Sequence, residues 1–161
     1  MISFSTITSA SEAADYCSDV QRAAEYYDGS GRVPSRWIGA GAALQNLRGE
    51  VGRDALRAQL SGAVRDASGE ARQLGIQRGG EWQHRAGWDF TVSAPKSVSI
   101  EALVNGRSNV DNAHRQAVSA VVDYLERHAA AARINGQYVA TGNLTVAGYD
   151  YVSSRAGGSV E

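Results

Sequence analysis

The chain has 161 residues, with the 43% hydrophobic and 20% charged content of an ordinary folded domain. Its formal net charge of −1 excludes a globally basic nucleic-acid binder, so any contact with phosphate must be local. A single cysteine excludes an intrachain disulfide framework, and no apolar run is long enough to cross a bilayer. Since no secretory signal precedes these residues, we expect a cytoplasmic protein without a membrane partner.

The N-terminal residues predict a short strand followed by a helix. Residues 1–8 alternate loosely between apolar and polar side chains, and serine with glutamate then provides a helix start. The helix should reach about Tyr27, where an Asp-Gly-Ser-Gly run ends it. Tyr16 and Tyr27 share one helix face, with Tyr26 at its edge, so core or rim packing is the alternative to a chemical role.

Glycines and short amphipathic patterns fill the next part of the chain. Residues 29–50 hold repeated glycines around Trp37, which predict an ordered loop with a short helix near 40–47. A small amphipathic helix is expected over 53–66, and a hairpin or a loop over 67–86.

The stretch from Gly87 to Ser93 alternates strictly between apolar and polar side chains. A period of two predicts a strand whose apolar face, with Trp88 and Phe90, is buried in the core. Asp89 then lies on the polar face. There its carboxylate can accept a proton or orient an imidazole, or it can be a simple edge carboxylate.

A Ser-Ala-Pro-Lys-Ser turn follows this strand and carries the single lysine, Lys96. Two hydroxyls, an ammonium and exposed helix N–H groups suit an anion such as a backbone phosphate. Serine before a helix is, however, most often a cap without a ligand. A short helix over 98–104 and a long helix over 108–132 are expected next.

The last part of the sequence completes an α+β pattern. Asn135-Gly136 predicts a hairpin turn, and a final strand is expected over 143–152. Strands at both ends with helices between them indicate an α+β fold, in which helices cover one face of a mostly antiparallel sheet. No internal repeat or linker is present, so residues 1–161 are expected to form a single domain.

Together these segments resemble the MobF (TrwC/TraI-type) conjugative relaxases from about Met1 to Arg155. The matching stretches are A-A-D-Y-C with a following Y-Y, R-W-I-G-A-G-A, G-W-D-F-T-V-S-A-P-K-S-V-S, A-H-R-Q-A-V, T-G-N-L and S-S-R. The resemblance implies part of a relaxase domain with a histidine-hydrophobe-histidine (HUH) endonuclease fold. It implies site-specific nicking of single-stranded or hairpin plasmid DNA at an origin of transfer, with relaxosome proteins as further partners.

The same resemblance assigns the catalytic residues. Tyr16 falls on the first nucleophile, which attacks the scissile phosphate and stays bound to the 5′ end of the nicked strand. Tyr26 and Tyr27 fall on the second tyrosine pair, which is used in a later strand transfer. Asp89 corresponds to the carboxylate beside the nucleophile. Because a phenol is mostly protonated at neutral pH, such a tyrosine needs a nearby base or cation.

DNA contacts and metal ligands follow from the resemblance as well. Arg155 corresponds to a basic residue near the scissile phosphate, and Lys96 lies in the signature turn with a DNA-binding or structural role. Cys17 replaces a tyrosine that often completes the first pair. The family holds Mg²⁺ or Mn²⁺ with three histidines, but Tyr151 stands at the first of these positions.

We therefore expect no metal site and no cofactor in this chain as it stands. The H-x-H pair that carries the other two ligands would begin about where the sequence stops, which implies a chain truncated or diverged before that motif. The chain's own three histidines form no ligand set by spacing. Two functions remain open: a DNA-nicking relaxase, and a catalytically incompetent remnant that binds single-stranded or hairpin DNA without cutting.

Overall fold

A computed structural model describes residues 1–28, 33–66, 68–134 and 136–151, apart from the side chains of residues 21–28 and 134. The helices are α1 (Ala10–Asp28), α2 (Ala40–Leu44), α3 (Arg53–Leu60), α4 (Lys96–Ser99), the π-helical turn η1 (Ile100–Val104) and α5 (Ser108–His128). The strands are β1 (Ile2–Ile7), β2 (Ser35–Ile38), β3 (Ala63–Arg65), β4 (Ala71–Gln73), β5 (Ile76–Arg78), β6 (Glu81–Gln83), β7 (Gly87–Val92), β8 (Ala131–Ile134), β9 (Gln137–Ala140) and β10 (Val146–Tyr149).

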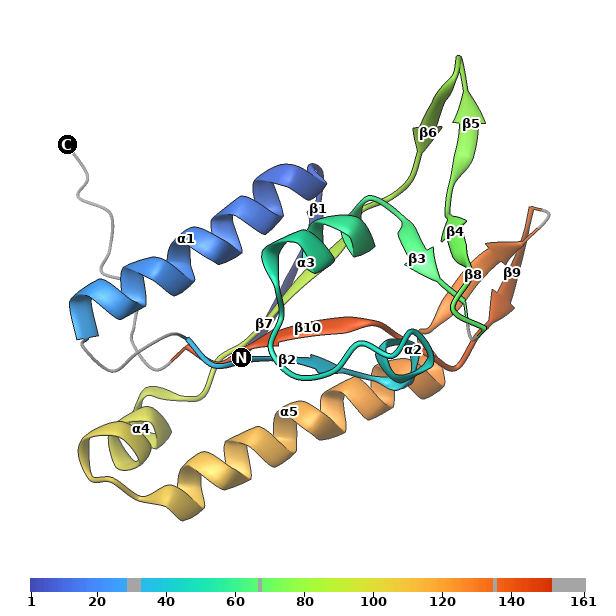
Figure 1. Ribbon diagram of the computed structural model, residues 1–161. Coiled ribbons are helices and arrows are strands. Elements are labelled where there is room, and N and C mark those ends of the chain that lie inside the picture. The colour runs from blue at the N-terminus through green and yellow to red at the C-terminus, as the bar shows by residue number, and fades with distance from the viewer. Residues whose placement is uncertain (29–32, 67, 135, 152–161) are drawn as a thin grey trace.

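The predicted α+β class with antiparallel strands is confirmed. Every strand pair in the described part of the chain is antiparallel, and the strands form separate two-stranded pairs instead of one continuous sheet. The pairs are β1–β7, β10–β2, β3–β4, β5–β6 and β8–β9. Figure 1 shows α1 and α3 on one side of β7, β10 and β2, and α5 along the other side, while the β5–β6 and β8–β9 hairpins project from one end.

A small hydrophobic core packs α1 against the strands. Its buried centre consists of Ala14, Val51 and Leu56, one from α1, one from the loop before α3 and one from α3. Partly buried side chains surround this centre: Cys17, Trp37, Leu60, Ala147 and Tyr149. At the rim, the Arg53 guanidinium on α3 pairs with the Asp15 carboxylate on α1. The middle of α1 is therefore held against β2, β10 and α3.

The glycines of the R-W-I-G-A-G-A stretch allow a close approach between the start of α2 and the loop that carries Leu144. A Cβ on Gly41 would lie 2.7 Å from the carbonyl carbon of Leu144, and one on Gly39 would lie 2.4 Å from the Leu144 oxygen. Gly39 also has a φ of +96°, which disfavours other residues. The Glu126 carboxylate accepts hydrogen bonds from the Ala40 N–H at 2.7 Å and the Leu144 N–H at 2.9 Å. These glycines thus serve loop packing beside α5.

Several predicted boundaries change in the structure. The helix expected over 53–66 ends at Leu60, because Gly62 has a φ of +79° and β3 starts at Ala63. The helix expected over 108–132 ends at His128, where β8 takes the following residues. An ordered loop was predicted where the structure has β2, which pairs with β10 over residues 35–38. The hairpins expected over 67–86 and around Asn135-Gly136 are confirmed by their strand pairs.

The strand predicted at Gly87 is confirmed, but the burial predicted for its apolar face is wrong. Trp88 and Phe90 are 49% and 45% exposed. The reason is that β7 pairs with β1 alone among the described strands, and Phe4, which faces Phe90 across the pair, is itself 68% exposed. Alternation therefore predicted which side chains share a face, although not whether that face is covered.

Candidate active site

Tyr16 lies in the middle of α1 with its side chain turned out of the core. It is 46% exposed, whereas Ala14 is fully buried and Cys17 is partly buried against the strands. Successive helix residues point about 100° apart, so seating Ala14 and Cys17 inward places Tyr16 at the rim. A tyrosine that served only the core would be buried. The phenol of Tyr16 is thus accessible to a large substrate such as DNA.

Cys17, next to Tyr16, marks where α1 meets the strands. Burial raises the pKa of the Cys17 thiol, a hydrogen bond from the Tyr149 hydroxyl lowers it, and the Asp89 carboxylate raises it again. The net direction is upward, so the thiol stays protonated near neutral pH. The Asp89 charge has the smallest of these three effects on the Cys17 thiol, so the carboxylate lies within electrostatic range of the residue that follows Tyr16.

Asp89 lies in the middle of β7. It pairs in register with Ser5 of β1, and its side chain is exposed. Since side chains alternate along a strand, Asp89 points away from the face that carries Trp88 and Phe90. This is the polar face on which the alternation of the sequence placed it.

Two tyrosines line the same region from the end of β10. Burial raises the pKa of Tyr149, and its hydrogen bond to Cys17 adds to this effect. The ring of Tyr151, 52% exposed, stacks 6.5 Å from that of Tyr149. Tyr149 is therefore held as a neutral phenol. Tyr151, at the expected position of a metal histidine, lies beside Tyr149, the partner of Cys17.

The residues that the structure describes do not form a metal-binding set. No group of three or more His, Cys, Asp or Glu side chains is positioned within them to hold an ion. A phenol such as Tyr151 must lose its proton before it ligates well, so it is a poor replacement for imidazole. The donors on these residues therefore do not fit the metal that the family resemblance implies, and no chemical step is assigned to it.

Of the other predicted site residues, only Lys96 is described together with its side chain. Lys96 begins α4 with an exposed side chain, and the preceding Ser93 is tied to Met1 by two backbone hydrogen bonds of 2.7 and 2.8 Å. The turn thus anchors the end of the β1–β7 pair. Tyr26 and Tyr27 lie in the last turn of α1, but their side chains are outside the description. Arg155 also lies outside the described residues.

An ion-pair network that the sequence did not predict joins α5 to the strands. Arg115 on α5 and Arg36 on β2 both donate to Asp150, the latter at 3.0 Å, and Arg115 also donates to Asp111 at 2.9 Å. The Asp111–Arg115 spacing of i,i+4 is visible in the sequence. The contacts of Arg36 and Arg115 with Asp150 join distant segments, so no local pattern revealed them. Because these arginines are paired with carboxylates, they are poorer candidates for phosphate contacts than unpaired ones.

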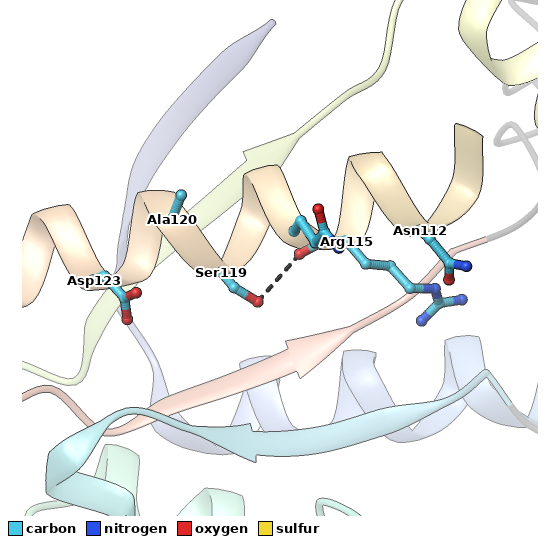
Figure 2. Close-up of a pocket in the computed structure, with 6 residues that line it drawn as sticks. Asn112, Arg115, Ser119, Ala120 and Asp123 are labelled. Carbon is cyan, nitrogen blue, oxygen red and sulfur yellow. Dashed lines mark hydrogen bonds between the residues drawn. The ribbon is translucent and has the colours of Figure 1, made fainter. Parts of the chain in front are cut away.

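A hollow of about 420 Å³ lies beside this network along α5. Figure 2 shows its side chains projecting from the helix, with the Ser119 hydroxyl donating to the Arg115 carbonyl oxygen. The lining comes from α5 alone: Asn112, Arg115, Gln116, Ser119, Ala120 and Asp123. One open helix face without converging groups from other elements forms no catalytic arrangement. The Tyr16 region, where α1, β7 and β10 converge, is the better candidate.

These features define an α+β protein with an accessible helix tyrosine beside a strand carboxylate. A family model described as TrwC relaxase matches residues 10–159, and the chain belongs to this family. The chain is 37% identical over 158 residues to the multifunctional conjugation protein TraI of Escherichia coli, and 35% identical to that of strain K12. Each alignment covers 96% of the chain and 8% of the relative.

Solved structures of the conjugative relaxase TrwC in complex with oriT DNA are similar as well. A metal-free complex is 35% identical with a TM-score of 0.61, and covers 91% of this chain and 48% of that one. A metal-bound complex is 33% identical with a TM-score of 0.63, and the match covers 91% of this chain and 49% of that one. The chain therefore spans about half of these structures. Within the described residues, no helix is long and apolar enough to cross a membrane.

Proposed function

We propose that this chain supplies the nucleophile-bearing part of a relaxase active site. Residues 1–161 then belong to one relaxase domain that nicks a DNA strand at an origin of transfer and passes that strand on. The observation that carries the proposal is the exposure of Tyr16 on α1, in a chain of the TrwC relaxase family. Asp89, whose charge acts on the neighbouring Cys17, is the proposed base. A phenol and a carboxylate are the two groups that a transesterification needs.

The proposed reaction is an exchange of one phosphodiester for another. The Tyr16 Oη attacks the scissile phosphorus, the new O–P bond forms, and the bond from phosphorus to the 3′ oxygen breaks. Asp89 accepts the phenolic proton, and the 3′ oxygen leaves as a hydroxyl after gaining a proton. The products are a 5′-phosphotyrosine and a free 3′ end. Tyr26 or Tyr27 performs the second attack during strand transfer.

The family's divalent metal would polarise the scissile phosphate when bound. Its donors must come from outside the residues described. The groups that this chain does provide are the nucleophile, the carboxylate and a surface for DNA. The protein acts in the cytoplasm on plasmid DNA, together with the relaxosome.

Two projecting hairpins support the proposal of a DNA partner. On β8–β9, the Tyr138 ring is 81% exposed, and the Arg133 guanidinium lies 5.8 Å from its centroid. On β5–β6, Trp82 is 50% exposed and pairs in register with Gln77. Exposed aromatic rings stack on unpaired bases, and arginine contacts the backbone. Both hairpins extend from the body of the protein (Figure 1), as a DNA-contacting ribbon requires. Lys96 and Arg155 are the proposed contacts near the scissile phosphate.

The test of DNA binding compares Tyr138→Ala with Tyr138→Phe. Fluorescence anisotropy with a labelled single-stranded oligonucleotide should show weaker binding for the alanine variant and near wild-type binding for the phenylalanine variant, because stacking needs the ring alone. If Tyr138→Ala and Tyr138→Phe bound the oligonucleotide equally well, the β8–β9 hairpin would not be part of the DNA-binding surface. Covalent chemistry is tested separately by an adduct assay with Tyr16→Phe.

A further inference from the structure

Asp150 directly follows β10 and is held by arginines from two different elements. Its Oδ2 accepts a hydrogen bond from Nη1 of Arg36 on β2 at 3.0 Å and another from Nη1 of Arg115 on α5. Its own N–H donates to the Pro34 carbonyl oxygen at 2.9 Å, which extends the β10–β2 pairing by one residue. Asp150, Arg36 and Arg115 are called here the Asp150 clamp. The clamp ties the end of β10 to its neighbouring strand and to α5.

The segment around Asp150 contacts the helices on both sides of β10. Successive side chains of an extended chain point to opposite sides. Accordingly, the rings of Tyr149 and Tyr151 stack on one side, with centroids 6.5 Å apart, while Asp150 between them reaches α5. Tyr149 packs with Cys17 of α1 against the hydrophobic core. Figure 1 shows α1 and α5 on opposite sides of β10, so this short segment connects the two helices.

A short series of contacts leads from the clamp to Tyr16. Tyr149 directly precedes Asp150, and its hydroxyl is hydrogen-bonded to the Cys17 sulfur. Cys17 in turn directly follows Tyr16 on α1. If the clamp released the end of β10, the Tyr149 hydroxyl would move with it. The inner face of α1 would then lose this contact, and the direction of the Tyr16 side chain would be less well defined.

The charges and exposure of the clamp favour a geometric role. The side chains of Arg36 and Arg115 are 40% and 36% exposed, and that of Asp150 is 25% exposed. Ion pairs this open to solvent contribute little to the free energy of unfolding. Arg115 also pairs with Asp111, so two guanidiniums face two carboxylates and their charges balance. The clamp therefore offers little attraction to a phosphate, and its main effect is to fix the end of β10.

We propose that Asp150 is a positioning residue for Tyr16, the proposed nucleophile. It acts through Tyr149, whose hydroxyl contacts Cys17 on α1. The arginines hold Asp150, Asp150 holds the end of β10, and β10 holds the turn of α1 that carries the nucleophile. No member of the clamp touches the substrate. The catalytic consequence rests on the proposed function, whereas the effect on α1 rests on the contacts alone.

The first experiment measures the alkylation of Cys17, the only cysteine of the chain, by iodoacetamide at one fixed pH. Asp150→Ala should accelerate alkylation roughly threefold or more, because the contact between α1 and β10 opens locally. Asp150→Asn keeps an acceptor oxygen of the same reach, so it should restore part of the wild-type rate. Asp111→Ala is the matched control. It removes a carboxylate from the same Arg115 without touching β10, so it should alkylate as wild type.

The second experiment separates positioning from DNA binding. With a saturating single-stranded oligonucleotide bearing the transfer origin and Mn²⁺, Asp150→Ala should slow the formation of the Tyr16 adduct by about tenfold or more. Its dissociation constant for the oligonucleotide, measured by anisotropy, should stay at the wild-type value. Asp111→Ala should change neither quantity. Arg36→Gln opens the clamp from β2 and should reproduce the slower adduct formation, even if Asp150→Ala does not fold.

Three results would overturn the proposal. One is a wild-type alkylation rate for both Asp150→Ala and Arg36→Gln. Another is an equal acceleration by Asp111→Ala, since the pairing of Arg115 would then matter and the end of β10 would not. The third is a loss of DNA affinity in parallel with the adduct rate, which would make the clamp a DNA contact. A wild-type chain that forms no adduct would contradict the proposed function alone, and faster alkylation of Asp150→Ala would still support the positioning of this turn of α1.

Discussion

The Tyr149 hydroxyl on β10 donates to the sulfur of Cys17 on α1. This contact joins α1 to the strands one residue after Tyr16. It determines which face of α1 is turned toward the strands. With Cys17 inward, Tyr16 faces outward beside the strand that carries Asp89. The position of the candidate nucleophile therefore follows from the packing of its neighbour.

The first prediction concerns the pH dependence of Cys17. Its pKa is raised in the folded chain, chiefly by burial, so folding favours the protonated thiol. The associated stability is complete below the ordinary thiol pKa and is lost as pH rises through the folded value. Alkylation with iodoacetamide should accelerate at higher pH for the folded chain than for the chain unfolded in urea.

Tyr149→Phe provides the matched variant for this titration. It removes the hydrogen bond that lowers the Cys17 pKa but keeps the ring, so the alkylation profile should move to still higher pH. Mass spectrometry of the alkylated protein measures both profiles. A profile for Tyr149→Phe that moves to lower pH would contradict the assigned contact.

The second prediction concerns Gly41. Alanine there would place Cβ 2.7 Å from the backbone of Leu144, which forces one of the two loops to shift. We expect a loss of about 1–3 kcal/mol in the free energy of unfolding, measured by urea denaturation. Gly52→Ala is the control, because nothing lies within 4 Å of its added Cβ. Equal stabilities for the two variants would show that the loops do not approach as described.

The third prediction concerns Glu126, whose Oε1 accepts from the N–H groups of Ala40 and Leu144. Glu126→Ala leaves both donors without this acceptor and should cost about 1–3 kcal/mol of unfolding free energy. Glu126→Gln retains an acceptor oxygen of the same reach, so it should cost less. The two variants are compared by thermal and urea unfolding. A greater loss for glutamine than for alanine would rule out the bridging role.

Sequence reasoning predicted the classes of the elements, because α1 and β7 show their periodicities within a few residues. Periodicity alone left the roles of Tyr16 and Asp89 open, and the family resemblance supplied them. The exposure of Trp88 and Phe90 was missed because alternation defines a face without saying what covers it. The Asp150 network was missed because it joins residues far apart in the sequence. The site residues stay predictions: Tyr16, Tyr26, Tyr27, Asp89, Lys96 and Arg155.

The fourth prediction concerns the proposed contacts with DNA phosphate. Lys96→Ala and Arg155→Ala should each weaken single-stranded DNA binding and lower the slope of log affinity against log salt by about 0.7. Arg127→Ala is the control, because its guanidinium donates to the Asp123 carbonyl of its own helix. Affinities are measured by anisotropy across a salt series. If only Arg127→Ala lowered the slope of log affinity against log salt, Lys96 and Arg155 would not be DNA contacts.

The most direct measurement is the Tyr16 adduct. Single-stranded oligonucleotides tiling the transfer region are incubated with the chain in Mg²⁺ or Mn²⁺, and the products are analysed by mass spectrometry. We predict a 5′-phosphotyrosine on Tyr16 that Tyr16→Phe abolishes and Tyr124→Phe preserves. Salt-dependent binding without any adduct would contradict the account and leave a DNA-binding module that does not cut.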